Sequence, residues 1–215
     1  MRTFWLALLA IAIASTARAD SAPLVKVEFS NPGLYPAQWT LELHPNGSGH
    51  FHAEGGTPPS GDLASPAKID RDITLGEDFT SHIFHVVHDP HVLQGKCESH
   101  LKVAFQGMKK ITYSGPDAEG GCEFNYSNNK QIQDLGDSLV AVGSTLIEGA
   151  RLELLYQHDP LGLDKAIQYV VEASDDGRLQ QICAIRGILE RLEDDPHVLD
   201  RVRKRARLLL SHAGS

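Results

Sequence analysis

The stretch from Asn129 to His158 limits the possible folds of this chain more than any other. Asn128 or Asn129 can cap its start, because a short polar side chain accepts a hydrogen bond from a free helix N–H group. Asp159-Pro160 ends it, since the residue before a proline avoids helical backbone angles. These two signals predict a single helix of roughly 29 residues and about 43 Å.

Apolar residues cover most of the surface of this predicted helix. One face repeats at steps of three and four residues, through Ile132, Leu135, Leu139, Val142 and Leu146. A second line at seven-residue spacing consists of Gly136, Gly143 and Ala150. Glycine inside a helix costs about 1 kcal/mol relative to alanine, so close packing is the natural reason to keep two. We predict a spine helix, residues 129–158, with a β half on one flank and a helical half on the other. An ordinary long helix that is weakened by its glycines is the alternative.

Residues 1–19 have the pattern of a secretory signal peptide. Arg2 precedes an apolar run from Phe4 to Ala14, and Ala17-Arg18-Ala19 matches an A-x-A cleavage site. The run is shorter than the ~20 apolar residues of a membrane span, and no later segment qualifies. We expect a soluble periplasmic or secreted protein, cleaved after Ala19. Cleavage removes two arginines and changes the formal charge from −8 to −10, and so acidic a chain argues against nucleic-acid binding.

Residues 20–128 predict an antiparallel, β-rich α+β domain. Residues 24–29 alternate apolar and polar side chains, as a strand does. The next two strands form a hairpin through the three-residue loop 45–47, which pairs Leu41 with Phe51 and Glu42 with His50. A one-residue slip would move the histidines to the core face.

The rest of this domain is predicted to contain one helix and three short strands. Residues 55–70 are expected to form a surface loop. A helix then runs from Ile73 or Thr74 to about residue 87, with Thr74 and Glu77 as a capping box. Between residues 101 and 128 three strands follow, with Phe105 opposite Ile111 and Val103 opposite Tyr113. The result is an antiparallel sheet with one packed helix.

Histidines gather on two of these elements. The predicted hairpin places Glu42, His44, His50 and His52 on one exposed face. His82 and His85 lie three residues apart on the polar side of the predicted helix. Imidazole and carboxylate groups are good ligands for zinc, copper or nickel, so these residues are candidate ligands of a divalent metal. The alternative is a solvated face with pH-dependent charge, which we favour because no spacing here is diagnostic.

The chain contains Cys97, Cys122 and Cys183. Export permits disulfides. Cys97 and Cys122 flank the same β region, whereas Cys183 belongs to a helical pattern. We predict a disulfide between Cys97 and Cys122 and a buried free thiol at Cys183.

Residues 129–215 predict an all-helical region packed on the β-rich domain. After the spine helix, helical patterns cover residues 161–173, 179–192 and 197–211, and short connections predict antiparallel neighbours. Residues 159–165 and 195–201 share a D-P-x-x-L-D-basic pattern at a spacing of 36 residues. This pattern resembles HEAT-like helical repeats, although it covers less than two copies. It is also ordinary helix-start chemistry, with Asp as cap and Pro in the first turn, as in a plain small bundle.

A basic run occupies the last predicted helix. It consists of Arg201, Arg203, Lys204, Arg205 and Arg207. A solvated face that complements the helix dipole explains such a run. A docking strip for anionic lipid or an acidic partner is the alternative.

Several enzyme motifs are absent from the sequence. It contains no H-E-x-x-H, G-x-S-x-G, C-x-x-C or phosphate-binding glycine loop. The order of signal peptide, hairpin, helix, short strands and helical tail resembles uncharacterised exported bacterial proteins. We expect a non-enzymatic module without a cofactor, which binds a protein or peptide through its sheet edge or helical tail. Histidine-based metal binding and an unrecognised periplasmic hydrolase are the alternatives.

Overall fold

The computed structural model describes residues 22–58, 65–89, 91–93, 97–116 and 118–213. The predicted signal peptide, residues 1–19, lies outside these ranges. The predicted α+β class is confirmed: a six-stranded antiparallel sheet carries helices on one face, and shorter helices follow a long one. Within the described ranges, no helix is long and apolar enough to cross a membrane.

The sheet has the strand order β4-β3-β2-β1-β5-β6, and every neighbouring pair is antiparallel. Its strands are β1 (Leu24–Ser30), β2 (Gln38–Leu43), β3 (Ser48–Glu54), β4 (Lys68–Thr74), β5 (Met108–Ser114) and β6 (Glu119–Phe124). The first four strands form a meander from the centre to one edge. The chain then crosses the sheet and adds β5 on the other side of β1.

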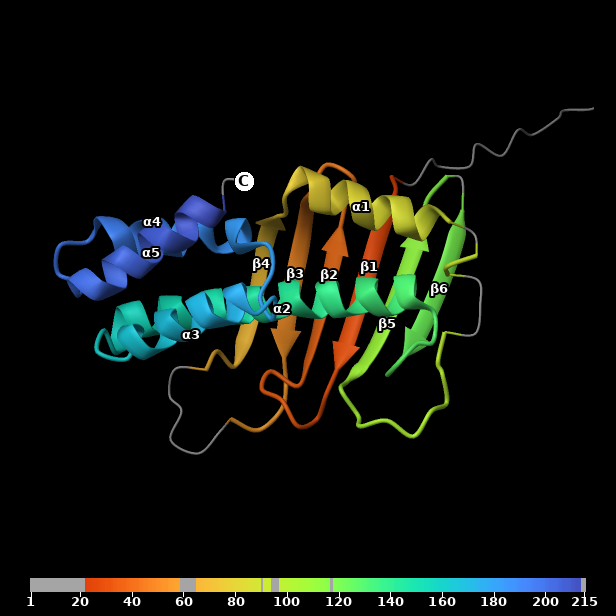
Figure 1. The fold of residues 1–215 in the computed structure, drawn as a ribbon, viewed down its shortest axis with the longest axis horizontal. Coiled ribbons are helices and arrows are strands. Elements are labelled where there is room, and N and C mark those ends of the chain that lie inside the picture. Colours follow the sequence, from red (N-terminus) through yellow and green to blue (C-terminus); the bar gives the residue numbers. More distant parts are fainter. Residues whose placement is uncertain (1–21, 59–64, 90, 94–96, 117, 214–215) are drawn as a thin grey trace, which may run out of the picture.

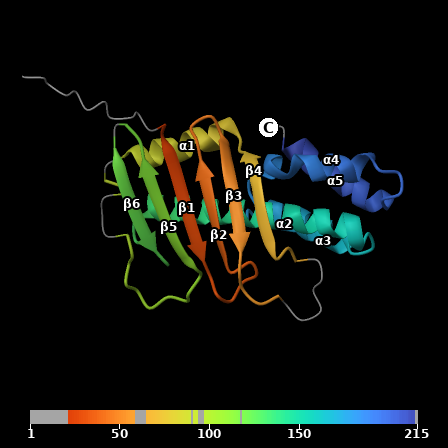
Figure 2. The same ribbon diagram turned by 180° about the vertical axis from the view of Figure 1, so that it is seen from behind.

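The helices form a second layer on one face of the sheet, and the other face is open (Figures 1 and 2). They are α1 (Glu77–His88), α2 (Lys130–His158), α3 (Leu163–Asp175), the short 3-10 helix η1 (Ile182–Ile185), α4 (Arg186–Asp194) and α5 (Asp200–His212). The helix α1 lies across one end of the strands and α2 across their middle. Beyond β4, α2 continues into the group formed by α3, α4 and α5.

The hairpin register is confirmed. Leu41 pairs with Phe51 and Glu42 with His50, as the three-residue loop predicts. Leu41 and Phe51 are fully buried beneath the helix layer. Glu42, His50 and His52 therefore point to the open face, because strand side chains alternate between faces.

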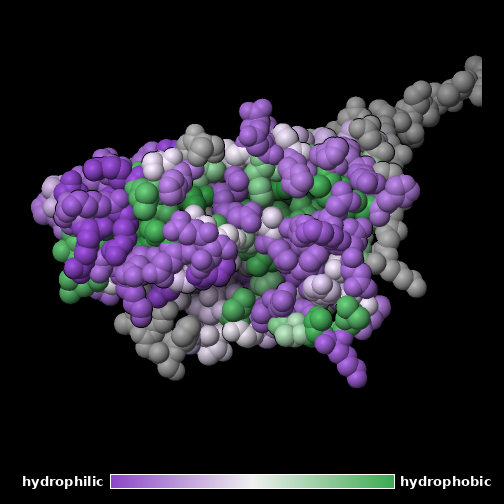
Figure 3. Space-filling view, viewed as in Figure 1, coloured by the Kyte–Doolittle hydropathy of each residue, from purple (hydrophilic) through white to green (hydrophobic). Residues whose placement is uncertain are grey.

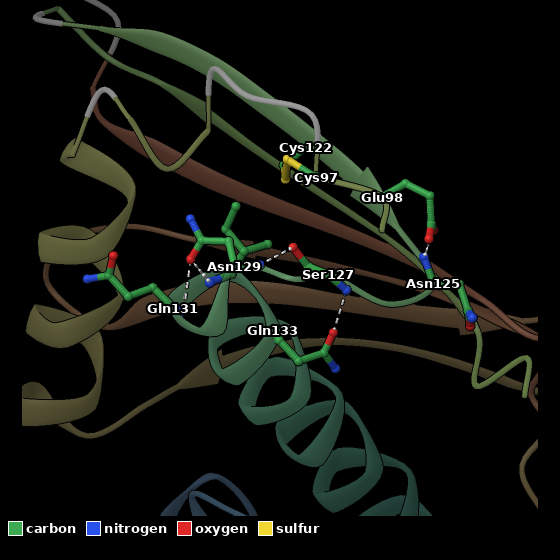
Figure 4. The surroundings of a disulfide bond; sticks show 9 residues. Cys97, Glu98, Cys122, Asn125, Ser127, Asn129, Gln131 and Gln133 are labelled. Carbon is green, nitrogen blue, oxygen red and sulfur yellow. Dashed lines mark hydrogen bonds between the residues drawn. A yellow bond between two sulfur atoms is a disulfide. The ribbon is translucent and has the colours of Figure 1, made fainter. Parts of the chain in front are cut away.

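The spine helix begins and ends where the sequence predicts. The Asn129 side chain caps α2 by accepting hydrogen bonds from the N–H groups of Gln131 and Ile132, at 3.0 and 3.4 Å (Figure 4). The Gln133 side chain accepts a hydrogen bond from the N–H of Ser127 at 2.8 Å, which ties the preceding loop to the helix. The helix ends at His158, and Asp159 is its C-terminal cap.

The glycines of α2 lie where other parts of the chain approach closely. A Cβ atom at Gly136 would lie 2.7 Å from Phe124, and one at Gly143 would lie 2.8 Å from Trp39. Both aromatic side chains belong to the sheet. Further along, Gly149 faces Ile185 of η1, in the helical half. The predicted long helix is confirmed, but the two halves of the protein do not lie on opposite flanks of it: the first half of α2 packs on the sheet and the second half mainly on the other helices.

Two elements between residues 55 and 88 differ from the prediction. Residues 68–74 form β4, whereas we expected a loop as far as residue 70. The helix α1 begins at Glu77 and not at residue 73 or 74, and its cap residue is Gly76. The capping box of Thr74 and Glu77 is therefore wrong. The N–H of Gly76 instead donates a hydrogen bond to the side chain of Gln181, at 2.8 Å.

The predicted strand with Val103 and Phe105 is also wrong. Residues 101–107 form no strand, and β5 pairs with β1 along seven residue pairs, with Ile111 opposite Val27 and Tyr113 opposite Val25. This distant pairing places β5 between β1 and β6. Leu101, Val103 and Phe105 are left exposed. Figure 3 shows hydrophobic residues gathered at the lower right of the molecule, below the sheet.

The remaining helices follow the predicted pattern, but their starts differ. The helix α3 begins at Leu163 and α5 at Asp200, and neither has a side-chain cap. Asp159 and Asp195 are instead the C-terminal caps of the helices before them, α2 and α4. The D-P pattern therefore marks where a helix ends, because proline stops the preceding helix.

Candidate functional site

The two edges of the sheet differ in how the chain covers them. At β6, Gly121 N–H donates a hydrogen bond to the Leu93 carbonyl at 3.1 Å, and Ser99 N–H donates to the Tyr126 carbonyl at 2.8 Å. The predicted disulfide between Cys97 and Cys122 is present and holds this covering segment on the strand (Figure 4). An edge strand normally offers free main-chain groups to other chains, and these contacts occupy part of the edge at β6.

The opposite edge, β4, has no such cover. Within the described residues, no strand lies outside β4; η1 packs against the strand, and Glu153 of α2 contacts its Arg71 side chain. Figure 2 shows from the open side that α2 and α3 continue past β4 with no strand in front of them. The helix layer therefore extends further than the sheet on this side (Figure 2).

Two hollows follow one another along this free edge. One, of about 390 Å³, lies beside residues 66–71, and its floor is formed by α2 residues Ala150, Glu153, Leu154 and Gln157. The other, of about 280 Å³, lies beside residues 72–74 and is lined by Cys183, Ala184, Arg186 and Gly187. We call this the β4 groove. Its lining combines small or apolar side chains with the polar or charged side chains of Glu153, Gln157 and Arg186.

An ion-pair cluster holds the floor of the β4 groove against the strand. Arg71 points to the helix side of β4 and contacts both carboxylate oxygens of Glu153, at 2.6 and 3.3 Å. Glu153 also contacts Arg191 of α4 at 3.3 Å. These contacts link β4, α2 and α4, and planar arginine groups favour such paired geometry.

The open side of the same edge carries a chain of alternating carboxylates and imidazoles. His50 contacts Asp72 through Nδ1 at 2.9 Å and Asp70 through Nε2 at 3.1 Å. His52 contacts Asp70 through Nδ1 at 3.0 Å and Glu54 through Nε2 at 3.2 Å. We call these five residues the histidine–carboxylate cluster. A neutral imidazole has only one N–H, so all four contacts are hydrogen bonds only when both rings are protonated.

The cluster changes the acidity of its members. The hydrogen bond to Asp72 raises the pKa of the His50 imidazole above its ordinary value, with partial opposition from burial. The hydrogen bond from His52 lowers the pKa of the Asp70 carboxyl below its ordinary value. Both pKa shifts favour the charged forms, a protonated imidazole beside an ionised carboxylate.

These shifts predict a pH window of stability. The His50 contribution is present below the unfolded pKa of about 6.5 and is lost as pH rises through the higher folded pKa. The Asp70 contribution is present above the unfolded pKa of about 3.9 and is lost as pH falls through the lower folded pKa. We expect the cluster to stabilise the protein most between about pH 4 and 6.5. Thermal unfolding across pH should show that His50→Gln removes the decline above this window; an unchanged profile would contradict the assignment.

The candidate metal ligands do not form one site. Glu42, His50 and His52 share the open face, while His44 lies exposed in the turn after β2. His82 and His85 are exposed on α1, which covers the opposite face. In the part of the chain that the structure describes, no three His, Cys, Asp or Glu side chains are placed to hold a metal ion. The acidic neighbours of His50 and His52 were not part of the prediction, because β4 was not recognised.

The basic run on α5 is paired within the protein. Arg201 and Arg205 both contact Asp164 of α3 at 2.7 Å. The other three contact groups on α4 or α5: Lys204 with Asp200, Arg207 with Glu193, and Arg203 with the Glu193 carbonyl. Figure 3 shows a strongly hydrophilic surface over these helices. Four of these five residues therefore already have carboxylate partners, and Arg203 is bound to a main-chain carbonyl.

The third cysteine has no disulfide partner, but it is less buried than we predicted. Cys183 is partly exposed, and its thiol contacts the Gln181 side chain at 3.6 Å. It lines both the β4 groove and a hollow of about 510 Å³ between the start of α1 and the helical half. Gln181 has a left-handed backbone, with a φ of 58°, which lets its side chain reach Gly76.

The sequence matches no family model and no curated protein. Sequence reasoning missed the β4 groove because it assigned residues 68–70 to a loop and started a helix at residue 73 or 74. The alternation of Ile69 and Ile73 was the available signal, but the charged Arg71 between them on the same face hides it.

Proposed function

We propose that this is a non-enzymatic exported protein that binds an extended segment of a protein or peptide partner, which adds a strand to the edge of β4. The observation that carries the proposal is the mismatch between the layers: the helix layer extends beyond β4, but the sheet does not. An added strand would pair its main chain with β4 and rest its inner side chains on the β4 groove. Strand addition to a free sheet edge is a recurring mode of peptide recognition.

The contrast between the edges supports this choice. Among the described residues, the chain's own contacts occupy part of the β6 edge, whereas no strand pairs with the outer edge of β4, which favours β4 for an incoming strand. Main-chain hydrogen bonds would supply affinity with little dependence on sequence. The β4 groove would supply a preference for particular sequences, because it would contact every second side chain of the bound strand.

A second copy of the chain fits this edge poorly. Antiparallel pairing of two β4 strands about Arg71 would place Asp70 opposite Asp72 of the other copy. Pairing about Asp70 or Asp72 would place that carboxylate opposite itself. Like charges directly opposite each other destabilise a strand pair. A different chain is therefore the better occupant.

The helical tail is the weaker of the two predicted surfaces. Its five basic residues are already engaged with Asp164, Asp200 and Glu193. An acidic partner would have to compete with these contacts. Exposed pairs of this kind contribute little individually, but together they reduce the positive field that would attract a partner.

The proposal can be tested with synthetic peptides that match β4 in length, seven residues. The series Ser-Val-X-Ala-X-Val-Ser, with X as Lys, Ser or Glu and both ends blocked, reads the same in both directions and suits either strand orientation. At least one member should bind with a Kd below about 1 mM, and methylation of its main-chain nitrogens should abolish binding. The absence of binding by all three at that concentration would contradict the proposed function.

A substitution in the groove floor gives the matched control. Leu154→Glu places a charge on the floor and should weaken the best peptide on the order of tenfold, about 1.4 kcal/mol. Leu161→Glu makes the same change at a residue that is 82% exposed and outside the β4 groove, and should leave binding unchanged. Isothermal titration calorimetry measures the Kd of the peptide for both variants, and thermal unfolding verifies that both are folded. Equal weakening in both would argue against the groove.

A further inference from the structure

We infer that the strand bound at β4 carries two basic side chains two residues apart with a small residue between them, and that it binds more tightly when His50 and His52 are neutral. This inference rests on the proposed function and names the partner class and the regulation of the same edge. It follows from the side chains that β4 presents on its two faces.

The open face of β4 presents two adjacent negative charges. Asp70 and Asp72 point to this face, with Lys68 before them and Thr74 after them. Asp72 is 95% exposed and Asp70 about half exposed, so both are accessible from the strand edge. Side chains directly opposite in neighbouring strands lie about 4.5–5.5 Å apart, and pairs of opposite charge stabilise the sheet. A strand beside β4 would therefore match this face with basic residues opposite Asp70 and Asp72.

The inner face sets the size of the residue between those two. Arg71 faces inward at this level, where its ion pair with Glu153 occupies the floor. An opposing side chain has room only if it is small. On either side of Arg71, Ile69 and Leu154 border the first hollow and Ile73 borders the second. Apolar residues therefore suit the positions of the bound strand that face these two hollows. The matching strand reads apolar, basic, small, basic, apolar.

The histidine–carboxylate cluster sets how negative this edge is. With both imidazoles protonated, the three carboxylates and two imidazoliums sum to −1. With both imidazoles neutral, the sum is −3. Other charged groups near the rings are Glu42, which pairs with Lys26 at 3.2 Å, and Lys68, which lies 3.9 Å from Asp70. Carboxylates and lysines titrate outside about pH 5.5–8, so the histidines control the charge of the edge in that range.

The peptide series separates this inference from the proposed function. The Lys peptide should bind on the order of tenfold more tightly than the Ser peptide, and the Glu peptide should bind most weakly. If the Ser or Glu peptide binds as well as the Lys peptide, the partner class is wrong while the edge binding stands. If none binds, the edge binding itself is wrong.

Charge reversal at the edge tests the two aspartates directly. Asp70→Lys/Asp72→Lys should reverse the preference, so that the Glu peptide binds best. The control Glu119→Lys/Glu123→Lys makes the same change in net charge on β6, at the covered edge, and should keep the Lys preference. A similar loss of Lys preference in both variants would show that net charge alone selects the peptide, which would overturn the inference.

The pH dependence tests the histidines. The Lys peptide should bind severalfold more tightly at about pH 8 than at about pH 5.5, and His50→Gln/His52→Gln should remove that difference. The same difference in the variant, or tighter binding at the lower pH in the unmodified protein, would contradict control by the cluster. The Ser peptide should show no such pH dependence in either protein.

Discussion

Replacing Gly143 with leucine should lower the free energy of unfolding by about 2 kcal/mol. A Cβ atom at this position would lie 2.8 Å from two ring carbons of Trp39. Trp39 is 4% exposed and stacks on Phe29, with 5.1 Å between ring centroids, so the ring has little room to move. Overpacking of this kind costs about 1–3 kcal/mol or more, against a gain of about 1 kcal/mol from removing a helix glycine.

Gly187 gives the matched control for this prediction. It lies in the first turn of α4, and a Cβ atom there would meet nothing within 4 Å. Gly187→Leu should leave stability unchanged or raise it by up to about 1 kcal/mol, because only the helix preference changes. Urea unfolding of both variants provides the comparison. Equal effects would mean that α2 does not press against Trp39 as described.

Removing the disulfide should cost on the order of 3 kcal/mol, the largest single effect that we expect. Cys97 and Cys122 are 25 residues apart in sequence, and a crosslink over such a loop restricts the unfolded chain. The bond also holds the segment that covers β6. Cys97→Ser/Cys122→Ser should therefore lower the urea midpoint and leave a second sheet edge open to other chains.

The remaining cysteine gives the control for the disulfide. Cys183 is partly exposed and has no disulfide, so Cys183→Ser should change stability by less than about 0.5 kcal/mol. Amide hydrogen exchange adds a second measurement, since loss of the disulfide should speed exchange at residues 119–124 more than at residues 38–43. A midpoint that is the same with and without the disulfide would contradict its assigned role.

The parts of the fold that the sequence predicts well depend on local signals. Asn129 and Asp159-Pro160 mark the ends of α2 by capping and by backbone restriction, and the structure agrees within one residue. Proline and glycine in the loop between β2 and β3 determine the register of that hairpin. The register in turn decides on which face of the sheet His50 and His52 lie. The same reasoning placed Cys97 and Cys122 in one β region, where they are bonded.

The parts that it misses depend on distant partners. Arg71 occupies an inward position on β4 because Glu153, 82 residues later, receives it. Lys109 occupies an inward position on β5, where its ammonium group donates to the Asn125 carbonyl at 2.9 Å and lies over the Phe124 ring. Burial lowers the pKa of Lys109, while Asp137 opposes that shift. In both strands an inward-facing charged residue interrupts the apolar alternation by which a strand is recognised.

The order of the strands was equally hidden from sequence reasoning. Each of Val103, Phe105, Ile111 and Tyr113 fits a local hairpin pattern, but β1 pairs with β5 across 78 to 90 residues, from Ser30↔Met108 to Leu24↔Ser114. The candidate site was missed for the same reason, since it also depends on residues far apart in the sequence. His50 and His52 were predicted on the open face, but Asp70 and Asp72 become their neighbours only through the pairing of β3 with β4.

The most direct test of the central claim is nuclear magnetic resonance of the isotope-labelled protein, titrated with the Lys peptide. Strand addition at β4 predicts shifts of the amide signals of residues 68–74, contacts between peptide and β4 main-chain protons, and slower exchange of β4 amides. Residues 201–207 on α5 and residues 119–124 on β6 should remain unchanged. Shifts confined to residues 201–207, with β4 unaffected, would contradict the account and transfer the binding surface to the helical tail.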